Sequence, residues 1–150
     1  DLYVVSIGVG YTLPFKLFAA PWVDAGALSA RLDSISIPGV RFRPIHIKPF
    51  YSTYKGENIS GVECYITDRN IAPLTLIQFY VMQELAAMYP DHNPLAISDA
   101  KRHAMFDKVC GSKEIRRRFS GKCRVDDMRS YWDKDVEPFR RASSRYYLYK

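Results

Sequence analysis

The run PLTLIQFYVMQELAAMYP, residues 73–90, is the most apolar stretch of this 150-residue chain and has a proline at each end. The polar residues Thr75, Gln78, Gln83 and Glu84 interrupt it. It is therefore too short and too polar to cross a bilayer, which takes about 20 apolar residues. We expect a buried helix here and no membrane span. A chain of this length forms one domain and can enclose such a helix in a core.

Three segments have the residue types of β-strands. Residues 2–9 are rich in Val, Ile and Tyr, and residues 61–67 alternate apolar and polar side chains as a half-buried strand does. Residues 40–47 also favour a strand, but Pro44 cannot donate to a sheet, which predicts an edge strand or a bulge. The polar and aromatic connection at 48–60 is long for a compact domain, so we expect it to be functional.

Capping residues and helical spacing predict further helices, and a last strand is expected at 146–149. The helices are one from Asp24 to about Leu32, one ending near Cys110 before Gly111, one from Ser112 to Gly121, and one from Val125 through Met128, Trp132 and Phe139 with a kink at Pro138. Few strands that do not alternate strictly with helices indicate an α+β fold, a small mixed or antiparallel sheet packed with several helices.

Positive charge is concentrated in the C-terminal third. Residues 101–150 hold 15 Lys and Arg and seven Asp and Glu, whereas residues 1–100 carry a net charge of −2. A basic region can bind nucleic acid, an anionic surface or an acidic substrate. Here the basic residues alternate with acidic and apolar ones, which favours a solvated helix face. No known nucleic-acid-binding motif is present, and we expect no nucleic-acid partner.

The glycine-rich stretch SIGVGYTLPFKLFAAPW, residues 6–22, begins like a phosphate-binding loop. A dinucleotide fingerprint needs a third glycine, where this chain has leucine, and a P-loop ends in Gly-Lys-Ser/Thr, which is absent. We therefore expect Gly8 and Gly10 to shape the backbone rather than hold a phosphate. Phe15 and Trp22 are expected to pack in the core.

Side chains for metal or nucleophilic chemistry are scattered. The three cysteines and three histidines have neither a disulfide pattern nor zinc-ligand spacing, so we expect no metal and no cofactor. A Ser or Cys nucleophile with a histidine base stays open, although no Gly-x-Ser-x-Gly elbow occurs. Asp68 and Arg69 form a site pair, or else Asp68 caps the helix at 73. No two carboxylates can be assigned to one cleft as a glycosidase requires; the candidates are Glu57, Glu63, Asp68 and Asp107.

A set of short motifs occurs in order along nearly the whole chain. They are Gly8-x-Gly10-x-Thr12-x-Pro14-Phe15, Ala20-Pro21-Trp22, Pro38-Gly39-Val40-Arg41-Phe42-Arg43-Pro44, Pro49-x-x-Ser52-x-Tyr54-x-Gly56, Gly61-Val62, Thr67-Asp68-Arg69, Gly111-Ser112, Ile115-Arg116, Trp132, Phe139-Arg140 and Tyr147-Leu148-Tyr149. Together they resemble the C-terminal part of the exo-β-N-acetylmuramidase family, bacterial glycosidases of peptidoglycan recycling.

The resemblance implies a larger N-terminal Rossmann-like domain, with residues 1–150 as a single C-terminal auxiliary domain of a two-domain enzyme. The family removes β-1,4-linked N-acetylmuramic acid from the non-reducing ends of peptidoglycan fragments. By resemblance, the cleft lies between the domains, and the catalytic acid belongs to the N-terminal one. The implied partners are a peptidoglycan-derived glycan and the protein's own N-terminal domain. The implied location is the periplasm, the cell surface or the medium after secretion.

The residues expected to face the substrate are Gly8, Gly10, Tyr11, Thr12, Ser52, Tyr54, Asp68 and Arg69. Family members commonly read Ser-Glu-Gly-Arg-Gly-Thr-Thr where this chain has residues 6–12, so Ile7 and Val9 replace a charged pair. The replacement removes charge-assisted contacts to the sugar. A non-catalytic glycan-binding or domain-docking module is therefore the alternative expectation.

Overall fold

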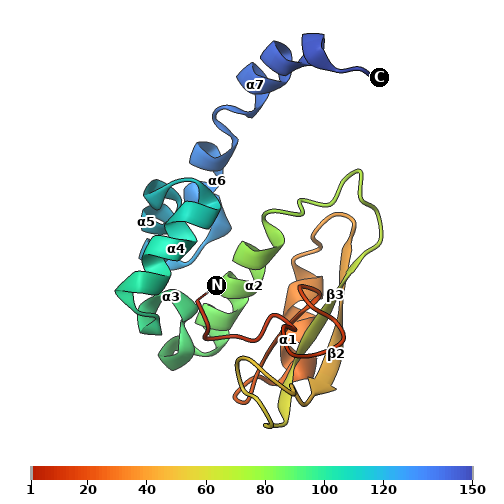
Figure 1. Ribbon diagram of the computed structural model, residues 1–150, viewed down its shortest axis with the longest axis vertical. Coiled ribbons are helices and arrows are strands. Elements are labelled where there is room, and N and C mark those ends of the chain that lie inside the picture. The colour runs from red at the N-terminus through yellow and green to blue at the C-terminus, as the bar shows by residue number, and fades with distance from the viewer. Residues whose placement is uncertain (1, 150) are drawn as a thin grey trace.

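A computed structural model describes residues 2–149, which form a three-stranded antiparallel sheet and a set of helices (Figure 1). The strands are β1 (Leu17–Ala20), β2 (Val40–Ile47) and β3 (Ile59–Ile66), in the order β1-β3-β2. In the central strand β3, Val62 lies opposite Phe18 of β1 and Cys64 lies opposite Phe42 of β2. The α+β class is confirmed, the sheet is antiparallel, and β2 is the edge strand that Pro44 predicts.

Caps at the helix ends follow the sequence. The helices are α1 (Ala25–Ser34), α2 (Ile77–Met88), η1 (Pro90–His92), α3 (Pro94–Ile97), α4 (Ala100–Cys110), α5 (Lys113–Lys122), α6 (Val125–Asp133), α7 (Val136–Ser143) and η2 (Ser144–Tyr146). The Asp24 carboxylate accepts from the Ala27 N–H at 2.9 Å, and the Ser112 hydroxyl accepts from the Glu114 N–H at 3.1 Å. Gly111 ends α4 with a φ of 76°. These caps satisfy N–H groups that a helix start leaves without partners.

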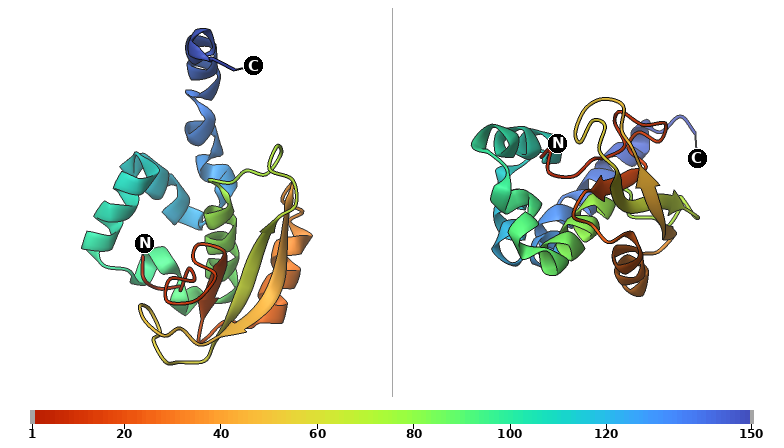
Figure 2. Two further views of the ribbon diagram at one scale, coloured as in Figure 1. Left: turned by 45° about the vertical axis from the view of Figure 1, so that its right-hand side comes forward. Right: turned by 90° about the horizontal axis from the view of Figure 1, so that it is seen from below.

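Helix α2 lies between the sheet and the later helices (Figure 2). One side of it joins α1 against the sheet face that Val40, Phe42 and Val62 form. On the other side, Leu76 and Phe79 enter a second apolar cluster with α4, α5 and α6. The apolar sequence of α2 thus reflects burial on both sides, as predicted. No helix within residues 2–149 is long and apolar enough to span a membrane.

The predicted strand at 2–9 is wrong. Among residues 2–149, the backbone of this segment pairs with the sheet only at a bridge between Ser6 and Ala19. Leu2 and Val4 are instead buried in the helical cluster. Their apolar character therefore serves packing, and β1 takes the place beside β3.

Three other boundaries differ from the sequence predictions. The helix expected over 73–90 begins only at Ile77, after a series of turns. The expected last helix is two helices, α6 and α7, because Pro138 has no N–H for the Lys134 carbonyl and its ring clashes there. Residues 146–149 form no strand, since no strand lies beside them to pair with.

Candidate functional site

The glycine-rich stretch and the 48–60 connection lie against each other, as their joint assignment to one site requires. The Gly10 carbonyl accepts from the Phe50 N–H at 2.9 Å. A Cβ on Gly10 would lie 1.9 Å from the Tyr51 carbonyl oxygen, so only glycine permits this approach. The Tyr54 hydroxyl donates to the Val4 carbonyl at 2.7 Å and ties the connection to the N-terminal segment. The predicted residues brought together here are Gly8, Gly10, Tyr11, Thr12, Ser52 and Tyr54.

A small hollow of about 50 Å³ opens between these two loops. Ile7 and Val9 line it beside Ser52. Ser52 and Tyr54 both have left-handed backbones, with φ values of 69° and 62°. Strained backbone of this kind clusters at functional sites.

The glycine-rich stretch and the 48–60 connection together are called the loop pair. Asp68 and Arg69 lie at the opposite end of β3 from it, because the 48–60 connection precedes β3 and these two residues follow it. The Asp68 carboxylate accepts from the Asn70 N–H at 2.9 Å and closes a turn. Helix α2 begins later, at Ile77, with no side-chain cap. The interpretation of Asp68 as the cap of that helix is therefore wrong.

Arg69 lines a larger pocket of about 570 Å³ at the edge of the sheet, where β3 runs past the start of β1. We call it the edge pocket. Its lining residues are Ile7, Phe15, Lys16, Phe18, Glu63, Cys64, Tyr65, Ile66, Arg69, Leu74, Thr75, Ile77 and Gln78. Ile7 also lines the small hollow, so the two groups of predicted residues meet at this side chain.

Of the two aromatic residues that the sequence assigns to the core, one packs there and the other is exposed. Trp22 packs against the core and stacks on His92, with ring centroids 4.5 Å apart, which confirms its assignment. Phe15 is 74% exposed and lines the edge pocket, so its core assignment is wrong. Its φ of 63° places it in a tight turn that directs the ring outward.

The charged side chains of the edge pocket differ in whether an ion pair within the protein already occupies them. Glu63 is buried and its carboxylate contacts the Arg43 guanidinium at 2.6 Å. The Glu63 carboxylate, as an acceptor beside the phenol, raises the pKa of Tyr65. Lys16 and Arg69 are exposed cations without a carboxylate partner among residues 2–149. The pocket can therefore attract an anion.

The edge pocket has little capacity for acid–base or nucleophilic catalysis by itself. Burial raises the pKa of the Cys64 thiol to about 11, so the thiolate nucleophile is scarce at neutral pH. Glu63 is the one carboxylate in its described lining, and it is ion-paired. Residues 2–149 also hold no group of three or more His, Cys, Asp and Glu side chains arranged for a metal. The arrangement is suited to binding rather than bond cleavage.

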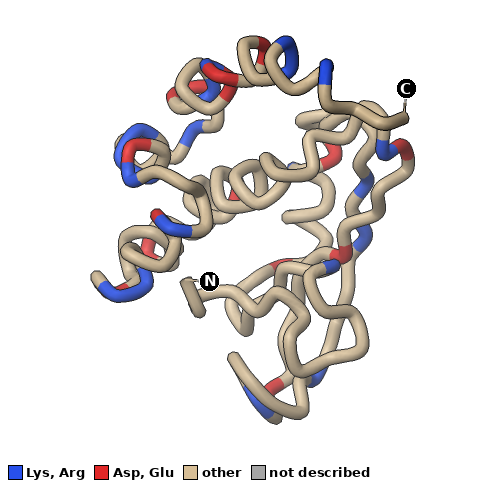
Figure 3. Tube along the Cα trace, turned by 45° about the horizontal axis from the view of Figure 1, so that its top comes forward, with Lys and Arg blue, Asp and Glu red and all other residues tan. Residues whose placement is uncertain are grey.

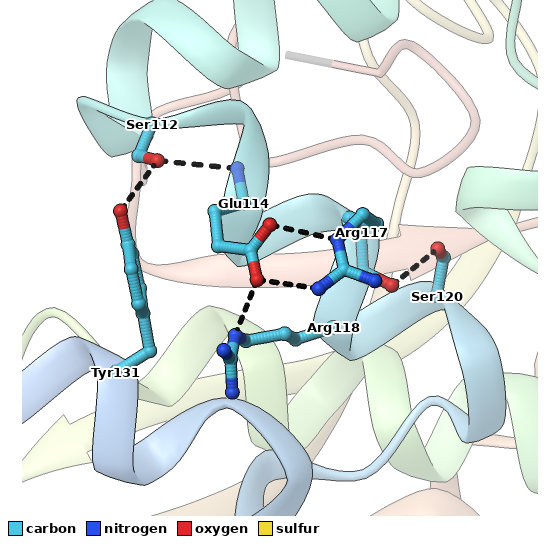
Figure 4. Close-up of polar contacts among 6 residues, drawn as sticks. All are labelled: Ser112, Glu114, Arg117, Arg118, Ser120 and Tyr131. Carbon is cyan, nitrogen blue, oxygen red and sulfur yellow. Dashed lines mark hydrogen bonds and ion pairs between the residues drawn. The ribbon is translucent and has the colours of Figure 1, made fainter.

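The basic C-terminal third is a set of ion-paired helix faces. Along these helices, basic and acidic positions lie next to each other (Figure 3). Glu114 of α5 accepts from the guanidinium groups of Arg117 and Arg118 at 2.6–2.7 Å (Figure 4). Arg116 contacts Asp107 of α4 at 2.7 Å. Much of the positive charge is thus neutralised locally, which agrees with a solvated helix face.

We expect the pKa of Glu114 to be about 2, below its ordinary value of 4.5, because Arg117 and Arg118 hydrogen-bond its ionised carboxylate. The contribution of Glu114 to stability is then complete above pH 4.5 and is lost as the pH falls toward 2. An NMR titration of the side-chain carboxyl carbon measures this value. In an Arg117→Ala/Arg118→Ala variant the pKa should return toward 4.5, and an unchanged low value would contradict the stated cause.

Sequence reasoning missed Lys16, Tyr65 and Gln78 as pocket residues. Lys16 directly precedes β1, whereas the residue types favour a strand at 2–9 and do not indicate one at 17–20. Its backbone carbonyl accepts from the Cys64 N–H at 2.7 Å, which fixes the position of the residue at the pocket. The alternation of apolar and polar residues around Tyr65 was the signal that could have indicated an outward-facing aromatic ring.

Comparison with known proteins gives consistent results. The family described as "Exo-beta-N-acetylmuramidase NamZ, C-terminal" matches residues 2–149. The peptidoglycan beta-N-acetylmuramidase NamZ of Bacillus subtilis (strain 168) is 28% identical over 145 residues, 97% of this chain. A crystal structure of a DUF1343 family protein from Bacteroides fragilis NCTC 9343 superposes with a TM-score of 0.97 and 56% identity over 99% of this chain.

Both relatives are longer than this chain. It spans 34% of the length of the B. subtilis protein and 39% of the B. fragilis chain. The family match nevertheless extends over all the residues that the structure describes. The chain therefore belongs to the family of C-terminal domains of the exo-β-N-acetylmuramidase NamZ.

Proposed function

We propose that the chain is the C-terminal domain of a peptidoglycan β-N-acetylmuramidase, and that it forms part of the surface that binds the terminal N-acetylmuramic acid. The family match over residues 2–149 carries this proposal. The edge pocket supports it chemically, because N-acetylmuramic acid joins a sugar ring to a lactyl carboxylate, and the pocket presents aromatic rings beside two cations.

Within this proposal, Arg69 and Lys16 bind the lactyl carboxylate. A guanidinium offers paired donors that match a carboxylate, and an ammonium adds a second positive charge. The exposed rings of Phe15 and Tyr65 supply flat apolar faces for the pyranose. The loop around Gly10 forms the rim on the side of the small hollow.

The reacting acid lies, in this proposal, in an N-terminal Rossmann-like domain. Support comes from the length of the B. subtilis relative, of which this chain covers 34%. The ion pair of Glu63, which leaves no free carboxylate in the described lining of the edge pocket, points the same way. Since peptidoglycan lies outside the cytoplasmic membrane, we place the protein in the periplasm, at the cell surface or in the medium.

Replacing Arg69 by Ala in the full-length protein is the test. We expect KM for a chromogenic N-acetylmuramic acid glycoside to rise about tenfold with kcat nearly unchanged, because one charge-assisted contact contributes about 1.4 kcal/mol or more to binding. A Lys16→Ala/Arg69→Ala double variant should lose more, and the loss should shrink at high salt.

Lys108, exposed on α4 outside the edge pocket, offers the matched control. Lys108→Ala removes the same charge and should leave KM unchanged. If the double variant has the KM of the unmodified protein, the edge pocket is not the carboxylate site.

A non-catalytic glycan-binding or domain-docking module is the second candidate. Ile7 and Val9 favour it, because they place apolar side chains where the family motif has charges. If the full-length protein binds muramyl ligands in calorimetry and never cleaves them, the chain is part of a binding module and the proposal of a muramidase is wrong. Turnover of the chromogenic glycoside would show the reverse.

A further inference from the structure

The last part of the chain projects away from the rest of the molecule (Figures 1 and 2). We call residues 134–149, which include α7 and η2, the C-terminal arm. Among residues 2–149, η2 is the one helix or strand that α7 contacts more than marginally. Within residues 134–149 only Ser143 is even half-buried. The domain itself therefore does little to hold the arm in place.

The arm is too apolar for a solvated tail. Phe139 is 71% exposed, Leu148 90% and Tyr149 89%. Val136, Tyr146 and Tyr147 are also exposed large apolar residues in this short segment. Several large apolar side chains exposed together in one short segment favour an interaction site, whereas single exposed apolar residues are ordinary.

The arm has the same placement in a longer relative. The B. fragilis structure superposes over 99% of this chain with a TM-score of 0.97, which includes the arm. A divergent arm would lower both the coverage and the score. Yet α7 has only eight residues, and a helix shorter than about 12 residues is marginal in water without packing. A defined arm with so few contacts in its own domain requires a contact outside it.

We propose that the C-terminal arm packs onto the additional N-terminal polypeptide of the longer protein and fastens the two parts together. This inference rests on the proposed function, in which the chain is the C-terminal domain of a longer enzyme. This chain covers only 34–39% of its relatives, so most of their length lies outside the described domain. Tethering gives that segment an effective concentration of about millimolar, which favours it over a second copy of the chain.

The surface that receives the arm is apolar with carboxylates at its rim. Phe139 and Leu148 need an apolar contact. Arg141 and Arg145 have no carboxylate within ion-pair distance among residues 2–149, unlike Arg140, which contacts Glu137 at 2.5 Å. Two unpaired guanidinium groups beside an apolar patch match acidic side chains on the opposing surface.

Hydrogen exchange on the full-length protein tests the proposal. We expect the amides of α7 to exchange about 100-fold more slowly than in an unstructured peptide, and a Phe139→Glu/Leu148→Glu variant to lose this protection. Val109→Glu is the control, because Val109 is 66% exposed on α4 and gains one glutamate in place of an apolar residue outside the arm. In the Val109→Glu variant, the amides of α7 should exchange as slowly as in the unmodified protein.

Two results overturn the proposal. One is exchange of the arm in the unmodified full-length protein at the rate of an unstructured peptide. The other is protection that depends on protein concentration and accompanies a dimeric mass in light scattering, which would assign the arm to a second copy. Hydrogen exchange needs no substrate, so its result is independent of activity. An unprotected arm in an active enzyme contradicts only this inference. A protected arm in an inactive protein contradicts only the proposed function.

Discussion

Replacing Gly10 by Ala is expected to separate the two loops of the candidate site and to lower the free energy of unfolding by about 2–4 kcal/mol. The added Cβ would lie 1.9 Å from the Tyr51 carbonyl oxygen and 2.8 Å from its carbon, both backbone atoms that cannot rotate away. The φ of 91° at Gly10 is itself unfavourable for alanine. The hydrogen bond from the Phe50 N–H to the Gly10 carbonyl should be lost with the displacement. Urea unfolding of the chain measures the stability change.

Gly56 offers a matched control in the same connection. Its φ of 79° is similarly left-handed, but a Cβ there would meet nothing within 4 Å. Gly56→Ala should therefore cost only the backbone strain, about 1 kcal/mol. Equal losses in the two variants would mean that close approach to Tyr51 contributes nothing. In the full-length protein, Gly10→Ala should also weaken binding of muramyl ligands, whereas Gly56→Ala should not.

The parts of the fold that the sequence predicts are those decided by local chemistry. Asp24 and Ser112 cap helices because their side chains reach N–H groups three or two residues away. Gly111 ends α4 because the chain there needs a left-handed residue. Pro44 marks an edge strand because it lacks an N–H. Each of these signals is complete within a few residues.

The failures concern contacts between distant segments. Leu2 and Val4 have strand-like composition, but the helical cluster buries them, and that cluster forms only in the folded chain. Ile77 begins α2 later than the apolar run suggests, since turns precede it. Propensity is a weak guide wherever tertiary packing decides.

The candidate site was predicted in pieces. The motifs grouped Gly10 with Tyr54 and placed Arg69 with them, and the structure brings the first two into one loop pair. Arg69 lies at the other end of β3, joined to the loops only through Ile7. The direction and register of β3 create this separation, and neither can be obtained from one sequence without the pairing partners. Lys16 lies at the pocket because β3 also pairs with the residue just before β1, through the hydrogen bond from the Cys64 N–H to the Lys16 carbonyl.

Phe79→Ala should lower the free energy of unfolding by about 3–5 kcal/mol, the largest stability effect that we expect from a single side chain. Phe79 is fully buried, and its ring makes edge contacts with Phe106, Phe119 and Trp132 at centroid distances of 5.9, 5.2 and 5.4 Å. Together with Leu76, it packs α2 against the helices that follow. Removing the ring leaves a cavity that several separate helices would have to close, so relaxation should recover little.

Phe139 provides the matched comparison, because it is the same residue type and is 71% exposed on α7. In this chain alone, Phe139→Ala should change the unfolding free energy by no more than about 0.5 kcal/mol. In the full-length protein the same substitution should weaken the arm contact and lower the protection of α7. A large loss for Phe139→Ala in the isolated chain would mean that the arm packs on its own domain. A loss for Phe79→Ala as small as the one expected for Phe139→Ala would contradict the central position of Phe79 in the cluster with α4, α5 and α6.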